Sequence, residues 1–464
     1  MKVIIICGFL FLLPGTLLSS QDTLSYKEIN EGGEEKVLGG YVRAGFYSWT
    51  DKADNKPYVS SAFSDIGLRL ETDNNNNFRA FGDLRFRYGS EFQKPVAKFD
   101  LREGFVAVKV KKWELSAGQK IIKWGRCDFT NPTSKLSAQN LISRSPDRED
   151  IDMGNLLAAT GFYPLPAIKL EAIVIPLYRP SSLIIEPVPL PENVTVNQLP
   201  SIITEKTMFS YAFKADFRLK NFDWSLSWFD GYDPLPGVAL SGFRLDLTQP
   251  FPVPYTDLSV KPFKNRMAGF DFETSAGPVG IRGEAAVTLP ELSFKTNEYV
   301  PRPEIKWAAG FDWSTGIWRF TGEYSGKYVL DFSPSSTEPL MGTELDLAKL
   351  SEMLSLPGFD LEDYVRDQVS AFNRLYNYQM KETYHSAGFR AEAELAYGKV
   401  LPSLFGMFNF TTRDLLVIPE IKMKPADALS IALGAEIYSG RKSSLFDLID
   451  DFMNGAYVSL RVDF

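Results

Sequence analysis

Few residues of this sequence have the types and spacing that enzyme chemistry needs. Its single histidine, His385, is followed directly by Ser386. A His–Ser hydrolase needs both side chains at one point, whereas neighbours on a strand face opposite sides. Of the two cysteines, Cys7 lies in an N-terminal apolar run and Cys127 in a polar segment. The sequence therefore predicts no enzyme, no metal site and no cofactor. A serine brought to His385 from elsewhere stays open as an alternative.

Charged side chains recur instead at every second position of several segments. From residue 78 to 88, Phe, Ala, Gly, Leu, Phe and Tyr alternate with Arg, Phe, Asp, Arg and Arg. The same alternation occurs in 209–219, 305–313 and 429–437. A period of two over about 9 to 11 residues is typical of a tilted strand that crosses a bilayer, with one face toward lipid and one toward a lumen.

The polar faces of these strands are the candidate pore lining. The residues expected there are Arg79, Asp83, Arg85, Arg87, Lys214, Asp216, Arg218, Arg282, Glu284, Arg319, Glu323, Arg390 and Glu392. Both charge signs occur in similar numbers, so we expect no dedicated filter for anions or cations. The three arginines of 78–88 either attract an acidic solute or pair with carboxylates of neighbouring strands.

Both ends of the chain carry signals of export and membrane insertion. Residues 1–20 join a basic start to an apolar core and small residues, which predicts a signal peptide, and the polar segment 21–38 is expected in the periplasm. The last residues alternate again, with Val458, Leu460, Val462 and the terminal Phe464 on one face. This pattern resembles the C-terminal insertion signal of Gram-negative outer-membrane barrels.

Turn signals set the topology. Short connections at 73–77, 111–112, 164–167, 220–222, 276–279, 315–317, 397–401 and 425–426 alternate with mostly longer ones, which include 89–98, 125–157 and 333–384. The sequence therefore predicts an all-β protein, a transmembrane antiparallel up-and-down β-barrel of about 18 strands over residues 39–464.

The connection 333–384 is predicted to be a helical insertion. Leu361, Val365, Val369, Phe372 and Tyr376 form an apolar stripe at helical spacing, after a shorter leucine stripe over 347–354. Such a stripe must be covered. The insertion either caps or narrows the pore mouth, or forms a satellite packed on the loops.

The most distinctive local motif runs from residue 118 to 141. Trp124, Gly125, Arg126 and Asp128 are followed by Asn131-Pro132-Thr133 and, further on, by SPDRED at 145–150. We expect Trp124 at the bilayer interface, Gly125 at a sharp turn, and Asp128 and Asn131 capping the loop backbone before Pro132. The loop either folds inward as a constriction or is purely structural.

This motif resembles the W-G-x-x-D with N-P-T signature of an uncharacterised family of Gram-negative outer-membrane β-barrels, a domain of unknown function. The strand AIVIPLYRPS at 172–181 is similar to that family's Pro-Leu-aromatic element, whereas Ser134 stands where the family often has an acidic residue. The resemblance implies movement of a solute or lipid-like molecule across the outer membrane.

Composition is consistent with this fold. With 44% hydrophobic residues and a net charge of -8, the mature chain offers neither runs for several membrane helices nor a basic surface for nucleic acid. We predict a porin-like outer-membrane channel or transporter for a solute or hydrophobic molecule. Expected partners are outer-membrane lipid and lipopolysaccharide, the barrel-assembly machinery, the unknown solute and an inner-membrane transporter. The alternatives are a lipid-acting barrel enzyme that uses His385, and an adhesion or assembly barrel with a closed lumen.

Overall fold

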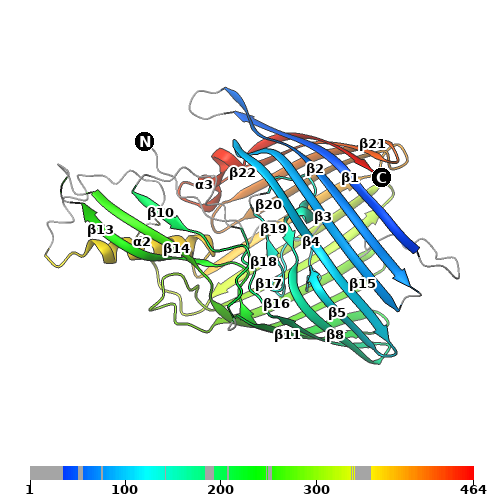
Figure 1. Cartoon of the computed structure of the whole chain (residues 1–464), viewed down its shortest axis with the longest axis horizontal. Coiled ribbons are helices and arrows are strands. Elements are labelled where there is room, and N and C mark those ends of the chain that lie inside the picture. The colour runs from blue at the N-terminus through cyan, green and yellow to red at the C-terminus, as the bar shows by residue number, and fades with distance from the viewer. Residues whose placement is uncertain are drawn as a thin grey trace.

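The chain forms a closed antiparallel β-barrel of 18 strands, as predicted from the period-two pattern (Figure 1). The computed structural model describes residues 35–50, 56–74, 77–141, 143–182, 193–205, 208–246, 248, 253–335, 337, 339 and 357–464. The barrel closes where the first strand pairs with both the second and the last, from Tyr41 opposite Asp463 to Ser48 opposite Ala456. Closure leaves no open sheet edge between the first and last strands, which a barrel in lipid requires.

The wall strands run up and down in chain order. They are β1 (Glu35–Thr50), β2 (Pro57–Asn74), β3 (Phe78–Glu91), β4 (Lys94–Val110), β5 (Trp113–Lys120), β8 (Asn155–Leu165), β9 (Ile168–Ile175), β11 (Ser210–Arg218), β12 (Phe222–Tyr232), β15 (Lys264–Ala276), β16 (Val279–Pro290), β17 (Glu304–Thr315), β18 (Trp318–Val329), β19 (Thr383–Ala393), β20 (Val400–Asn409), β21 (Leu415–Ala426), β22 (Leu429–Ser439) and β23 (Gly455–Asp463).

Alternate side chains of each strand have opposite environments. On β11 and β12, Phe213 and Leu226 are about half exposed, whereas Ala212 and Ser225 are buried. The outward faces are apolar and carry many aromatic rings, among them the stacked pair Phe217 and Trp224 near the ends with short turns. An apolar exterior around a polar interior is the pattern of a membrane-spanning barrel.

Short turns gather at one end of the barrel and long connections at the other. One connection differs from the expectation: 89–98 is no long loop, because β3 and β4 pair as far as Glu91 and Lys94. Phe92 and Gln93 alone form the turn, both with positive φ (48° and 62°), as in the tight turns that suit the twist of a hairpin. The first strand also begins at Glu35, where Glu35 lies opposite Asp73 of β2, rather than at Gly39. The expected signal peptide and most of the segment 21–38 lie outside the described residues.

The long connections build a small satellite on the barrel. The strands β10 (Val194–Asn197), β13 (Gly237–Asp246) and β14 (Val253–Lys261) form a three-stranded sheet, and the helix α2 (Leu361–Tyr376) packs on it. Figure 1 shows this satellite at the left, beyond the barrel end with the long connections.

The predicted apolar stripe of α2 is buried against the satellite sheet. Val369 and Phe372 pack with Leu258 and Val260 of β14, and the Asn373 side-chain nitrogen donates to the carbonyl of Val238 at 2.7 Å. Of the two alternatives for this helix, the contacts show packing on the loops. The leucine stripe over 347–354 lies outside the described residues.

Other short elements complete the connections. The connection between β5 and β8 contains β6 (Ala138–Gln139), the 3-10 helix η1 (Arg148–Ile151) and β7 (Asp152–Met153), and α3 (Leu445–Met453) precedes the last strand. The helix α3 was not predicted from the sequence. Neither described α-helix is long and apolar enough to span a membrane.

Candidate functional site

The connection between β5 and β8, residues 121–154, lies inside the barrel and is called the inner loop here. It carries the sequence motif and contacts inward-facing side chains of strands on several sides of the lumen. Its first half contacts β15, β16 and β18, and its second half contacts β1, β3, β22 and β23. The loop therefore crosses the lumen between two parts of the wall.

Glu284 of β16 is the centre of the first anchor. Its carboxylate accepts the backbone N–H groups of Arg126 and Cys127 at 2.5 and 2.6 Å and the hydroxyl of Thr133 at 3.1 Å. The Asn131 amide, oriented with its nitrogen toward Glu284, donates to the same carboxylate at 2.7 Å. The motif thus forms a pocket of donors around one buried wall carboxylate, an arrangement that stabilises its charge.

Gly125 is required by the backbone at this pocket. Its φ of +99° is rare for other residues, and a Cβ atom would lie 2.4 Å from Oε1 of Glu284 and 2.6 Å from the side-chain amide of Asn131. Pro132 follows within the same turn, where Ser134 N donates to the carbonyl of Asn131 at 3.2 Å.

Trp124 does not lie at the bilayer interface, which corrects the expectation. It is 3% exposed and packs inside the barrel with Leu136, Leu157 and Phe229. Its indole N–H donates to Glu171 of β9 at 3.1 Å. Because the chain turns inward after β5, the indole finds both apolar cover and an acceptor within the lumen.

Further contacts of the first anchor involve β16 again and reach two more strands, β15 and β18. The Arg126 guanidinium donates to Asp271 of β15 at 2.6 Å. The carboxylate of Asp128 accepts from Arg282 of β16 at 2.8 Å, so it makes an ion pair and does not cap the loop. Glu323 of β18 accepts the N–H groups of Asp128 and Phe129, both at 2.9 Å.

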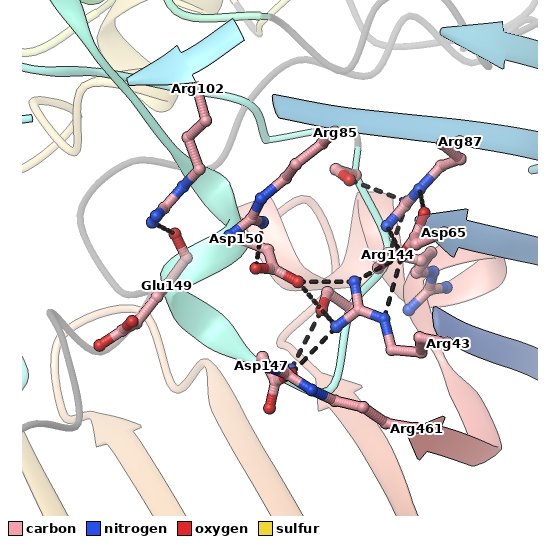
Figure 2. A network of polar contacts seen from close by, with 12 residues as sticks. Arg43, Asp65, Arg85, Arg87, Arg102, Arg144, Asp147, Glu149, Asp150 and Arg461 are labelled. Atoms are coloured by element: carbon pink, nitrogen blue, oxygen red, sulfur yellow. Dashed lines mark hydrogen bonds and ion pairs between the residues drawn. The ribbon is translucent and has the colours of Figure 1, made fainter. Parts of the chain in front are cut away.

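A second anchor holds the turn 145–150 against the opposite wall (Figure 2). Arg43 of β1 is 1% exposed and donates to Asp65 of β2 at 2.5 Å, to Asp147 at 3.0 Å and to Asp150 at 2.7 Å. Asp150 also pairs with Arg85 of β3. One buried guanidinium therefore joins two wall strands to the inner loop.

Neighbouring arginines extend this second anchor. Arg461 of β23 donates to Asp147 at 2.9 Å, and Arg102 of β4 donates to the carbonyl of Glu149 at 2.6 Å. From the loop side, Arg144 reaches Glu436 of β22 at 2.6 Å and the carbonyl of Met453 at the end of α3 at 2.7 Å. Figure 2 shows these side chains converging on the turn from several strands.

Burial and charge shift the loop's titratable groups in different directions. Burial alone would raise the pKa of Asp150, but the guanidinium groups of Arg43 and Arg85 hold that pKa well below its usual range. Burial raises the pKa of the Cys127 thiol far above its ordinary value, and the nearby carboxylates of Glu284 and Glu323 raise it further. Asp150 is therefore charged at neutral pH, whereas the Cys127 thiol stays protonated.

The remaining predicted lumen residues occupy varied positions. Arg87 pairs with Asp65 at 2.6 Å, Asp83 with Arg102 at 3.4 Å, and Lys214 with Asp271 at 3.5 Å. Arg79 pairs with Glu71 at 2.7 Å, and Asp216 lies 3.4 Å from Arg126. The guanidinium of Arg390 lies over the rings of Phe129 and Phe405. Within the described chain, no ion pair within 4.0 Å is found for Arg218, Arg319 or Glu392. The expected pairing of arginines with carboxylates of nearby strands thus occurs, together with pairing to the inner loop.

His385 and Ser386 lie on opposite faces of β19. The His385 ring is 2.6 Å by its Nδ1 from the hydroxyl of Tyr324 and borders Trp307, both on the outward face. Ser386 is buried on the inward face. The two side chains do not converge, as the strand period predicts.

The C-terminal residues lie on the closing strand. Val458, Leu460 and Val462 point outward and are about 40% exposed or more. The backbone of Phe464 exchanges two hydrogen bonds with Gly40 of β1, at 2.9 and 3.0 Å. The role of these residues as an insertion signal stays a prediction.

Solved structures of similar fold match nearly the whole chain, among them the following two. The outer membrane protein opdK from Pseudomonas aeruginosa is 8% identical, with 93% of this chain and 98% of that chain covered and a TM-score of 0.51. OccK9 (OpdG) of Pseudomonas aeruginosa is 9% identical, with the same coverage and a TM-score of 0.50. The chain therefore shares the β-barrel fold of these two proteins. At these identities the likeness concerns the fold alone. No protein-family model matches the sequence, and no curated protein matches it.

Sequence reasoning missed most of the anchor partners. It named Glu284 and Glu323 as lumen residues and left open whether the motif's loop folds inward or is purely structural, but it did not join the two. It also missed Arg43, Asp65 and Arg144. Arg43 and Asp65 occupy polar positions of period-two strands, and this pattern could have identified them as lumen residues. The pairing of Arg43 with Asp147, more than 100 positions away, has no local signal in the sequence.

Proposed function

We propose that this protein is an outer-membrane channel that passes a small solute through a lumen narrowed by the inner loop. The observation that carries the proposal is the loop's attachment to the wall at both anchors, Glu284 with Glu323 on one side and Arg43 with Arg85 on the other. A loop fixed across a barrel determines the width and the polarity of the path through the lumen and needs no conformational change to do so.

The charges of the lumen support a path for polar solutes without strict selection of one ion sign. Arginines and carboxylates of the wall pair with one another and with the loop, so their fields largely cancel. We propose the outer membrane as the site of action. Lipopolysaccharide, the barrel-assembly machinery and an inner-membrane transporter are its proposed partners.

The proposed relation to the uncharacterised W-G-x-x-D with N-P-T barrel family rests on the motif. Gly125, Asn131 and Thr133 all surround Glu284, so the motif has a physical task that a random match would lack. Glu284→Gln should therefore displace the motif residues of the inner loop and leave the wall strands paired.

Planar-bilayer conductance of the refolded chain tests the channel. We expect discrete current steps from the wild type and larger steps from the double variant Glu284→Gln/Glu323→Gln, because an amide binds backbone N–H groups less strongly than a carboxylate does. Arg218→Gln, at a position without a recorded ion pair, is the matched control.

Absence of current from both the wild type and the double variant would replace the channel with a closed barrel that binds a partner through its loops. Lipid hydrolysis that disappears in His385→Ala would replace it with a barrel enzyme.

A further inference from the structure

The hydrogen-bonded wall is interrupted along the first half of β4, beside residues 94–103. β4 pairs with β3 from Lys94 onward, but it pairs with β5 only over Gly104–Val110. β5 ends at Lys120, where the chain turns inward. Residues 94–103 therefore have a ladder partner on one side, and no strand in the described part of the chain pairs with their other side.

A cavity of about 530 Å³ lies at this edge. Residues 98–101 of β4 line it together with Gln119, Met153 and the connection that follows β9, including Arg179 and Ile202. Its volume is within the usual range for small-molecule sites, about 300–1,000 Å³.

The cavity contacts both faces of β4. Lys98 lies opposite Arg87, whose side chain binds Asp65 inside the barrel, and residues directly opposite in a ladder share a face. Phe99 lies opposite Phe86, which is exposed on the outer wall. The cavity thus borders lumen-facing and lipid-facing side chains at once.

The polar side of the cavity is positively charged. Its charged lining residues are Lys98, Arg179 and Asp100, which leaves one positive charge in excess. Arg179 pairs with Asp100 at 3.2 Å and donates to the carbonyl of Gly154 at 2.6 Å, which ties the connection after β9 to the edge of β4 and to the inner loop. Lys98 is exposed and makes no ion pair with any residue the structure describes.

The other side of the cavity is apolar and accessible. Phe99 is 69% exposed, Ile202 42% and Leu101 37%. Leu199 and Val260 add to this surface. A free cation beside an exposed apolar surface suits a molecule with an anionic head and an apolar tail.

We propose that this cavity is a lateral binding site for a single-chain anionic amphiphile, a fatty carboxylate, in the wall between β4 and the connection after β9. The carboxylate binds Lys98, and the chain lies on Phe99, Leu101 and Ile202. The site is separate from the anchors of the inner loop and does not depend on conduction of polar solutes.

The test is photolabelling of the refolded full chain in nanodiscs of dimyristoylphosphatidylcholine. The probe is palmitic acid with a diazirine in its chain, and labelled peptides are located by mass spectrometry. We expect labelling to concentrate on peptides that contain residues 98–101 and 199–202. Labels spread evenly around the outer wall would overturn the proposal.

Lys98→Gln tests the charge. It should weaken displacement of the probe by decanoate about 10-fold, the size expected for one charge-assisted hydrogen bond. The neutral methyl ester of the probe should label both proteins equally. Lys109→Gln is the matched control, because Lys109 is an exposed lysine near the other end of β4. This substitution should leave decanoate binding unchanged.

Two further results would count against the site. If acetate competes as well as decanoate, the apolar side is not used and the site binds only small anions. If Leu101→Asp leaves both acid and ester labelling unchanged, the chain does not lie on β4. Conductance of Leu101→Asp in planar bilayers should equal that of the wild type, because Leu101 lies on the same outward face as Phe99, so loss of this site and loss of the channel are distinguishable.

Discussion

Glu284 shows how much of the inner loop depends on a single side chain. Donors from residues 126, 127, 131 and 133 converge on its carboxylate. A buried carboxylate without such donors is costly, and the donors without an acceptor would be buried unsatisfied groups. The wall and the loop therefore stabilise one another at this point, and any residue that prevents the approach should release the loop.

Gly125→Ala should prevent this approach. The new methyl group would lie 2.4 Å from Glu284 and the residue would keep a positive φ, which costs about 1–3 kcal/mol in backbone strain alone. We expect larger and noisier single-channel currents and faster tryptic cleavage after Arg126. Gly316→Ala, also at positive φ but with nothing within 4 Å of its Cβ, carries the strain without the clash. Equal effects of the two substitutions would show that contact with Glu284 is unimportant.

Among the elements, the inner loop is held at two anchors of different character. The first uses backbone N–H groups around wall carboxylates, and the second uses wall arginines around loop carboxylates. Breaking a buried ion pair by removal of one partner costs about 3–5 kcal/mol because the other charge stays buried. The second anchor should therefore respond to charge and pH.

Asp150→Asn should loosen the second anchor at neutral pH. Arg43 and Arg85 hold the pKa of Asp150 below its usual range, so its stabilising contribution is present above the ordinary aspartate pKa of about 3.9 and disappears as the pH falls through the lower, folded-state pKa. The difference in conductance between the variant and the wild type should therefore stay constant from about pH 7 to pH 5 and disappear only in stronger acid.

The variant should show the raised conductance already at pH 7. The control is Ser143→Ala, which removes from the same loop an uncharged hydrogen-bond partner of Arg87 on β3. A difference between the variant and the wild type that disappears between pH 7 and pH 5 would mean that another group controls the second anchor.

The satellite is an element that should be separable from the pore. Val369→Asp places a carboxylate in the contact between α2 and the satellite sheet and loses about 1.5–3 kcal/mol of side-chain burial. We expect rapid proteolysis within α2, with unchanged conductance and an unchanged heat-modifiable shift of the barrel on gels. Glu362→Ala, on the exposed side of the helix, should change neither. A changed conductance in Val369→Asp alone would indicate that the satellite narrows the pore mouth.

These elements also show where sequence reasoning succeeds. The period of two fixes the wall because every strand repeats it, and the stripe from Leu361 to Tyr376 matches α2 because helical burial has its own period. The position of Trp124 was predicted wrongly, since a tryptophan after a strand suits a bilayer interface and a packed lumen equally well. The pairing of Arg43 with Asp147 joins residues over 100 positions apart, and no local pattern encodes such a contact.

On the scale of the whole molecule, closure determines whether the barrel exists at all. β1 and β23 come from the two ends of the barrel sequence, so closure brings together strands that are far apart in the chain. Phe464 takes part in this contact twice. Its backbone pairs with Gly40, and its ring lies over the same glycine, where a Cβ atom would be 2.8 Å from the ring.

Phe464→Ala should therefore slow assembly without changing the finished channel. The backbone pairing with Gly40 persists, whereas the ring and its apolar surface, 62% exposed toward the exterior, are lost. We expect a smaller folded fraction in outer-membrane preparations, measured by the heat-modifiable gel shift, and normal conductance for the molecules that do fold. Phe410→Ala removes another exposed outward ring, which lies at the long-connection end away from the closing contact. If both variants assemble equally slowly, general exterior hydrophobicity, and not the terminal contact with β1, governs insertion.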